Sequence, residues 1–368
     1  MTGADINRTG HGVGAENQTG TIRVMVVDDS LIARTVLSKM LEQTSDLVLV
    51  GMANSAEDAI EKLSQIEVDI ILLDLEMPGM GGLAGLPEIL ARAAGARVIV
   101  ISSLTTEGAE ATVTALAIGA ADTILKPRPG EFTSDYRNGL ANRIRAIGVS
   151  STERKKACFV APEGPPKKAD TLQKAARVIA IGASTGGIHS MCQMLSDLPE
   201  YIDQPILVSQ HLPNSFMPVF ARQLEIASSR KAKIAQDGMP VLPGEILIAP
   251  GDGHLTVVLK DEQPVVRIAQ HPVPNGCCPS VDPMLESLAK SFDGAVLGII
   301  LSGMGRDGVL GAQSVVDAGG SILVQNRETS AVWGMPRAVA EAGLASAILP
   351  PEELATRILS SRAVTKWT

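Results

Sequence analysis

The chain has 368 residues, of which 45% are hydrophobic, and this is enough for two domains with apolar cores. Its net charge is −8 and only 2% of its residues are aromatic. These values argue against nucleic acid as a main partner, because phosphate groups bind basic surfaces and bases stack on aromatic rings. The four cysteines form no CxxC pair, so we expect reduced thiols and a cytoplasmic protein.

Residues 1–20 are polar and rich in glycine, and they lack the apolar centre of a signal peptide. We interpret them as a disordered tail. No apolar run approaches the roughly 20 residues of a membrane-spanning helix, so we expect no insertion into a membrane.

Residues 21–147 alternate short apolar runs with segments of helical periodicity. This pattern predicts an α/β domain with a five-stranded parallel sheet and helices on both faces. The strands are expected at 21–27, 46–53, 68–75, 96–102 and 121–126, and the last helix at 136–147.

Residues 148–176 are rich in Lys, Pro, Ser and Gly and predict a linker. A second α/β domain is expected at 177–360, doubly wound around a mostly parallel sheet. Short runs within 244–269, with a Gly-Asp-Gly-His turn, predict an antiparallel hairpin insertion. The strands are expected at 178–182, 205–210, 244–250, 255–259, 265–269, 295–302 and 321–326.

Polar side chains follow four strands of the first domain: Asp28 and Asp29, Asp74, Ser102, and Lys126. Parallel strands bring their carboxyl ends to one edge, so these groups should converge there. Clustered carboxylates suit Mg²⁺, and a metal-bound carboxylate beside a lysine can accept a phosphoryl group. The alternative is that the acids only cap the following helices.

The second domain has a Gly-x-Ser-x-Gly motif at 182–186, placed between a strand and a helix. This motif exposes Ser184 on a sharp turn, next to the N–H groups of a helix terminus, as a nucleophile requires. A plain glycine turn or a phosphate loop fits the same residues. The spacing does not match a Walker loop or Gly-x-Gly-x-x-Gly.

A nucleophilic serine needs a base, and an acid that orients the base. His211 directly follows a strand that ends at the same edge as Ser184, whereas Asp307 follows a third such strand. The alternatives are a histidine bonded to backbone and an aspartate that caps the next helix. The other four histidines fit the role less well by position: His11, His189, His254 and His271.

Four motifs of the first domain, "VVDDS", "LLDLEMPGMGGL", "VIVISSLT" and "ILKP", resemble the receiver domain of response regulators, which has a flavodoxin-like fold. The resemblance implies that Asp74 accepts a phosphoryl group from a histidine kinase. It implies that Asp28 and Asp29, with Asp74, hold Mg²⁺. Ser102 would be the switch hydroxyl, and Lys126 would pair with the acyl phosphate.

The motifs "IGASTGG", "QHLPNSF", "NGCCPSVDPML", "LSGMGRDG" and "VQNRETSAVWGMPRAV" look like the catalytic domain of chemotaxis protein-glutamate methylesterases. The resemblance implies that Ser184 is the nucleophile, His211 the general base and Asp307 the orienting acid. It also implies that the N–H of Met304 stabilises the oxyanion, that residues 280–282 wall the substrate cleft, and that the esterase site uses no cofactor.

By this resemblance the chain hydrolyses glutamate methyl esters on chemoreceptors and deamidates receptor glutamines, for adaptation in chemotaxis. The receiver would cover the active-site cleft until phosphorylation loosens it. The chain departs from the family at Ile188-His189, where proline is common, and at Trp333, where tyrosine is common. Two alternatives are a signalling scaffold without activity and an esterase of another chemosensory pathway.

Overall fold

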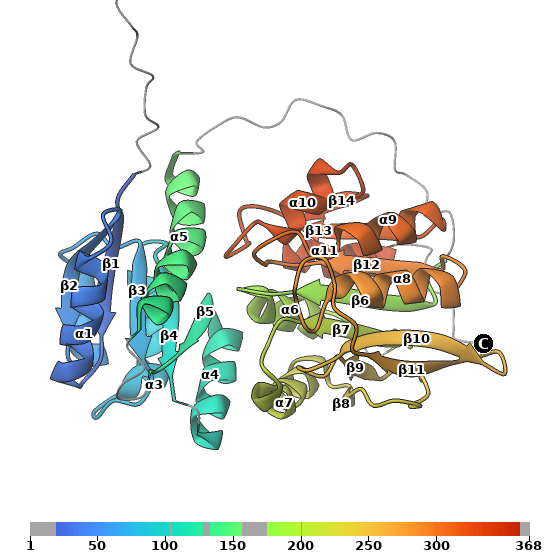
Figure 1. The fold of residues 1–368 in the computed structure, drawn as a ribbon, viewed down its shortest axis with the longest axis horizontal. Helices are drawn as coiled ribbons and strands as arrows, with labels where there is room; N and C mark the ends of the chain where they lie inside the picture. The colour runs from blue at the N-terminus through green and yellow to red at the C-terminus, as the bar shows by residue number, and fades with distance from the viewer. Residues whose placement is uncertain (1–19, 104, 128–132, 157–174, 200, 361–368) are drawn as a thin grey trace, which may run out of the picture.

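The structure is a computed structural model that describes residues 20–103, 105–127, 133–156, 175–199 and 201–360. Figure 1 shows two α/β domains that lie side by side, each built on its own sheet. The tail predicted at 1–20, except Gly20, and most of the predicted linker lie outside the described residues. Within the described residues, no helix is both long enough and apolar enough to cross a bilayer.

The N-terminal domain has the predicted five-stranded parallel sheet, in the order β2-β1-β3-β4-β5. Every residue of the central strand β3 is buried, since helices cover both faces. Ser30, Ser55 and Thr105 begin three of the helices by accepting a first-turn N–H. The elements are β1 Ile22–Val27, α1 Leu31–Glu42, β2 Leu47–Ala53, α2 Ala56–Leu63, β3 Ile70–Asp74, α3 Gly81–Arg92, β4 Arg97–Ser102, α4 Thr106–Ile118, β5 Asp122–Leu125 and α5 Ser134–Lys156.

Helix α5 is longer than the sequence pattern predicted. It was expected to end at Ile147, but it continues to Lys156, into the predicted linker. The part of α5 before this extension packs against the sheet through Ile144 and Ile147, which are buried. The final Glu-Arg-Lys-Lys has high helix propensity, which lets the helix continue beyond the apolar contacts.

The C-terminal sheet has seven strands, all parallel, in the order β14-β13-β12-β6-β7-β9-β8. The edge strands β8 and β14 were not predicted, because three residues are too few for a recognisable pattern. The strands are β6 Val178–Ala183, β7 Ile206–Gln210, β8 Ala232–Ile234, β9 Ile246–Ile248, β12 Val296–Ile300, β13 Ser321–Gln325 and β14 Ala347–Leu349.

Two apolar layers flank this sheet. One contains α6 and α7 together with α11, and the other contains α8, the hairpin and α10. The helices are α6 Gly187–Ser196, η1 Asn214–Phe216, α7 Met217–Ser228, α8 Val281–Ser291, α9 Val309–Asp317, α10 Met335–Glu341 and α11 Pro351–Ser360.

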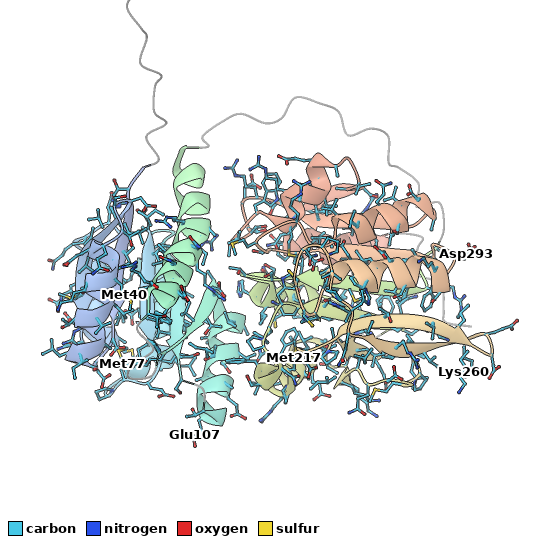
Figure 2. All side chains as sticks on the ribbon, viewed as in Figure 1. Met40, Met77, Glu107, Met217, Lys260 and Asp293 are labelled. Atoms are coloured by element: carbon cyan, nitrogen blue, oxygen red, sulfur yellow. The ribbon has the colours of Figure 1, made fainter. Side chains whose placement is uncertain are left out.

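The predicted hairpin insertion is shorter than expected. It consists of β10 (His254–Lys260) and β11 (Gln263–Ala269), and the chain reverses at Asp261 and Glu262, both with positive φ. Figure 2 shows Lys260 at the hairpin's end, far from the N-terminal domain. The prediction was wrong for β9, which joins the main sheet because its three apolar residues are buried on both faces. The Gly-Asp-Gly-His turn links β9 to β10.

The N-terminal domain packs against the C-terminal domain through α4, which contacts α6, α7 and η1. Leu116 of α4 belongs to the same apolar cluster as Ile188 and Phe216. Polar contacts at the rim of this cluster join His189 Nδ1 to Ala117 O at 2.7 Å and Arg97 to Ser330 O at 3.3 Å. His189 thus contacts the other domain.

Candidate functional site

Ser184 lies where β6 ends and α6 begins, at the carboxyl edge of the C-terminal sheet. Its N–H donates to Ser302 O at 3.0 Å, which holds the turn against the neighbouring loop. Gly186 begins α6 with a φ of +75°, and an added Cβ there would overlap that of Ala331. The turn therefore requires glycine at this position.

His211 follows β7 at the same edge. Its N–H donates to Ala183 O at 3.0 Å, and the side chain of Gln210 donates to Ser184 O at the same distance. On the ring, Nε2 lies 2.7 Å from Asp307 Oδ2. Because a carboxylate only accepts, Nε2 carries the proton, and Nδ1 holds the free lone pair of the neutral ring.

Asp307 is buried, with its carboxylate almost fully enclosed by donors. Oδ2 accepts from His211 and from the N–H of Val281, both at 2.7 Å. Burial alone would raise the pKa of Asp307, but the hydrogen bond and charge of His211 and the N–H of Val281 hold it well below its usual value. The donors to Oδ1 are Asn275 Nδ2, Ser280 Oγ, Asp282 N and Gly308 N.

The ionised Asp307 carboxylate in turn affects the pKa of His211. Burial disfavours the charged ring, but the hydrogen bonds to Asp307 and Cys277 and the charge of the Asp307 carboxylate outweigh burial and raise the pKa of His211 to about 9. The ring is therefore held in place as a strong base.

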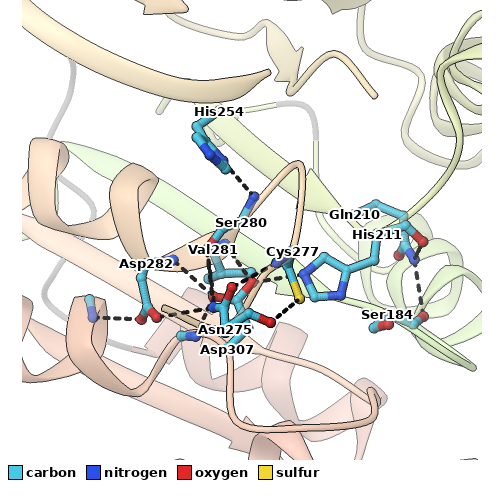
Figure 3. Close-up of polar contacts among 12 residues, drawn as sticks. Ser184, Gln210, His211, His254, Asn275, Cys277, Ser280, Val281, Asp282 and Asp307 are labelled. Carbon is cyan, nitrogen blue, oxygen red and sulfur yellow. Dashed lines mark hydrogen bonds and ion pairs between the residues drawn. The ribbon is translucent and has the colours of Figure 1, made fainter. Parts of the chain in front are cut away.

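Figure 3 shows the His211 ring between Asp307 and Ser184. In the described part of the chain, no hydrogen bond joins Ser184 Oγ to the ring. Both residues line the same cavity, so the hydroxyl and the ring face one shared space. Catalytic hydrogen bonds commonly tighten only when substrate binds.

This cavity has a volume of about 450 Å³ and lies between the two domains. Leu116, Tyr136 and Arg143 line it from the N-terminal domain, opposite Ser184 and His211. The N-terminal domain therefore forms one wall of the candidate site.

Met304 also lines this cavity, and its side chain is half exposed. Its N–H has no hydrogen-bond partner in the described ranges, so it is available to an oxyanion. Residues 280–282 were expected to wall the cleft, but they surround Asp307 instead, since their N–H and hydroxyl groups bond to its carboxylate.

A second candidate site lies at the carboxyl edge of the N-terminal sheet. Carboxylate oxygens of Asp28, Asp29 and Asp74 lie within 4.8 Å of one another. Lys126 Nζ lies 2.8 Å from Asp74 Oδ2 and 3.1 Å from Asp28 Oδ2. Burial raises the pKa of Asp74, an effect that Lys126 partly offsets. Asp28 Oδ2 is buried and has no partner among the described residues besides the Lys126 ammonium, so a hard cation such as Mg²⁺ fits these residues.

The hydroxyl of Ser102 lies 3.2 Å from that of Thr123, on the neighbouring strand β5. The Ser102 hydroxyl therefore hydrogen-bonds to Thr123 and not to Asp74. Ser103 instead donates to Glu76 at 2.6 Å.

Two residues of the esterase-like site lie in the motif "NGCCPSVDPML", but the sequence assigned no role to either of them. Asn275 donates to Asp307, and Cys277 lies beside His211. Both belong to the loop that connects the hairpin strand β11 to α8. The Asn-Gly pair at 275–276 marks a turn, but a turn signal does not say which side chain it approaches.

Comparison with known families agrees with this division of the chain. The CheB methylesterase model matches residues 179–358, and the response regulator receiver domain model matches residues 24–135.

Three relatives illustrate the similarity. The "Protein-glutamate methylesterase/protein-glutamine glutaminase 1" of Paramagnetospirillum magneticum is 36% identical, over 94% of this chain and 97% of that protein. A protein of Caulobacter vibrioides with the same name, numbered 2, is 39% identical over 92% of this chain and 98% of its own. Among solved structures, the CheB methylesterase catalytic domain of Thermotoga maritima is 34% identical and covers 50% of this chain and 97% of its own, with a TM-score of 0.49.

Proposed function

This chain belongs to the CheB methylesterase family of hydrolases and carries that family's receiver domain, and we propose that it removes methyl esters from glutamates of chemoreceptors and deamidates their glutamines. The observation that supports this most is the 2.7 Å hydrogen bond from His211 to Asp307, beside Ser184 in one cavity. A half-buried, oriented base next to a serine on a glycine turn is the arrangement that acyl transfer requires.

In the proposed reaction, Ser184 Oγ attacks the ester carbonyl while Nδ1 of His211 takes its proton. The N–H of Met304 stabilises the oxyanion that forms. His211 then returns the proton to the leaving group, so methanol departs from an ester and ammonia from a glutamine. Water attacks the acyl-serine with the same assistance, which yields glutamate and restores Ser184.

Asp307 is a positioning residue in this scheme. It holds the proton on Nε2 and stabilises the imidazolium that forms when Nδ1 is protonated. Its other donors leave it no freedom to rotate, since five N–H and O–H groups besides His211 bond to it.

The receiver supplies the proposed regulation. Asp74 would accept a phosphoryl group from a histidine kinase, and Asp28 and Asp29, with Asp74, would hold Mg²⁺, which offsets the charge of the transferred group. Lys126 already contacts Asp74 and would bind the phosphate. Ser102 would rotate from Thr123 towards the phosphate, which alters the receiver's β4–β5 side.

The same side of the receiver walls the cavity that contains Ser184, so a change there would open access for a receptor helix. The unphosphorylated chain would be closed and the phosphorylated chain open.

The direct test is methanol release from a methylated chemoreceptor. Ser184→Ala should lower the rate on the order of 10⁶-fold, as loss of a serine nucleophile does in related chemistry. Ser196→Ala, an exposed serine at the end of α6, should leave the rate unchanged. Full methanol release by a folded Ser184→Ala chain would refute the proposal.

A further inference from the structure

The candidate catalytic pair lies next to a thiol that the proposed reaction does not use. Ligand atoms of His211, Cys277 and Asp307 all lie within 4.8 Å of one another. They come from three separate segments: the end of β7, the loop before α8 and the loop after β12. We propose that these three side chains form a binding site for Zn²⁺ that overlaps the catalytic pair and switches it off.

The chemical types of the three ligand atoms favour zinc over magnesium. An imidazole, a thiolate and a carboxylate are the ligands of zinc sites, and three protein ligands leave a fourth position open for water. The receiver cluster offers only carboxylate oxygens, which suit Mg²⁺. Among the residues that the structure describes, two candidate metal sites thus have opposite chemical preferences.

The loop before α8 joins the thiol to the carboxylate. The N–H of Cys277 donates to Asn275 Oδ1 at 2.9 Å, while Asn275 Nδ2 donates to Asp307 Oδ1 at 2.7 Å. One amide side chain therefore orients the Asp307 carboxylate and fixes the backbone that carries Cys277, as residues behind metal ligands commonly do. The neighbouring Cys278 is exposed and lies outside the cluster.

Little movement is needed to admit the ion. Two ligands of a tetrahedral zinc, each at about 2.0 Å, lie about 3.3 Å apart. His211 Nε2 and Asp307 Oδ2 are 2.7 Å apart, so the ring would withdraw slightly as zinc replaces the shared proton. The N–H of Val281 would continue to hold Asp307 Oδ2.

Zinc at this position would remove the base. The coordinating nitrogen must be unprotonated, so a neutral ring bound through Nε2 carries its proton on Nδ1. The lone pair that Ser184 requires is then absent. The thiol proton of Cys277 goes to solvent, and no oxidant or reductant is needed. This consequence for activity rests on the proposed function, but binding of the metal does not.

Binding is tested on the full-length chain without a histidine tag, titrated with CoCl₂ in excess MgCl₂. Co²⁺ in a thiolate site gives a sulfur-to-metal charge-transfer band, which the all-oxygen receiver site cannot give. The band should appear, disappear in Cys277→Ser and persist in Cys278→Ser. No band in the unchanged chain, its survival in Cys277→Ser, or its loss in Cys278→Ser overturns the proposed ligand set.

A measurement that needs no variant guards against misfolding. ZnCl₂ should protect Cys277 from alkylation, but not Cys278, when both are mapped by mass spectrometry. Equal alkylation of Cys277 with and without zinc overturns the proposal. This result and the cobalt band stand even if Ser184→Ala shows that the chain is no esterase.

Inhibition is tested as the ratio of methanol release without and with ZnCl₂. At ten times the dissociation constant, about a tenth of the activity should remain, and EDTA should restore it. Cys277→Ser should weaken inhibition at least tenfold relative to its own zinc-free rate, whereas Cys278→Ser should match the unchanged chain. Equal inhibition of both variants overturns the role of Cys277.

Discussion

Thr185, the residue after Ser184, donates a hydrogen bond from Oγ1 to Asp122 Oδ2 of the receiver at 3.2 Å. Asp122 begins β5, the strand that leads into Lys126, and Lys126 contacts Asp74. A short run of receiver backbone therefore separates Asp74, the proposed phosphorylation site, from a residue adjacent to the candidate nucleophile. Burial raises the pKa of Asp122, although Arg143 partly offsets this effect.

Asp122→Ala should raise methanol release by the unphosphorylated chain about tenfold. The variant loses a hydrogen bond to a charged group, a contribution of about 1.5–3 kcal/mol that favours the closed arrangement. Asp122→Asn keeps an acceptor for Thr185 and should change the rate less. Equal, unaltered rates in both variants would show that this contact does not hold the domains together.

A small phosphodonor with Mg²⁺ should increase methanol release, and Asp74→Asn or EDTA should abolish the increase. The physical reason is that the phosphate needs both its acceptor and a cation to offset its charge. Asp58→Asn, an acid on α2 outside the cluster, is the matched control and should respond normally. A response that persists in Asp74→Asn would contradict phosphorylation at that residue.

Removal of residues 1–174 should raise the basal rate and make it insensitive to the phosphodonor, because the receiver wall of the cavity is gone. Circular dichroism and methanol release measure folding and activity of the truncated chain. A folded fragment that is no faster than the full chain would rule out simple covering of the site.

Methanol release should rise with pH to a midpoint near the His211 pKa of about 9, since the ring must lose its proton to act as a base. Asp307→Asn removes the charge that favours the imidazolium, so the midpoint should move towards lower pH. Its maximal rate should fall on the order of 10⁴-fold. Rates are corrected with Ser184→Ala, and an unmoved midpoint would argue against His211 as the base.

Gly303→Ala should reduce methanol release on the order of 10²-fold, because a misplacement of about 1 Å has that effect on catalysis. An added Cβ would overlap Met335 Sδ and come within 2.8 Å of Ser184 Cβ. Gly139→Ala, where an added Cβ meets nothing within 4 Å, is the control. Phosphorylation of the receiver should be normal in both, and an active Gly303→Ala chain would show that the turn tolerates displacement.

The apolar runs predicted eleven of the fourteen strands in their correct sheets, because buried parallel strands leave continuous signals. β9 was assigned to the hairpin, since nothing local distinguishes a short buried strand from a short hairpin strand. β8 and β14 form because they pair with the neighbouring strands β9 and β13, and their own residues carry little strand signal.

For the candidate site, the edge rule for parallel sheets places Ser184, His211 and Asp307 together, and the structure brings the latter two into contact. Their roles stay predictions. Asn275 and Cys277 could not be placed, because a loop's path depends on the surfaces it crosses. The hydroxyl direction of Ser102 is likewise set by Thr123 on another strand.

The bond from His189 to Ala117 O has an effect on α4 itself. Carbonyls in the last turn of a helix lack partners within it, and this one is satisfied from the neighbouring domain. If the two domains separated, Ala117 O would bond to water instead, and the final turn of α4 would fray more readily. Hydrogen exchange of the amides in the last turn of α4 would thus report whether the two domains are associated.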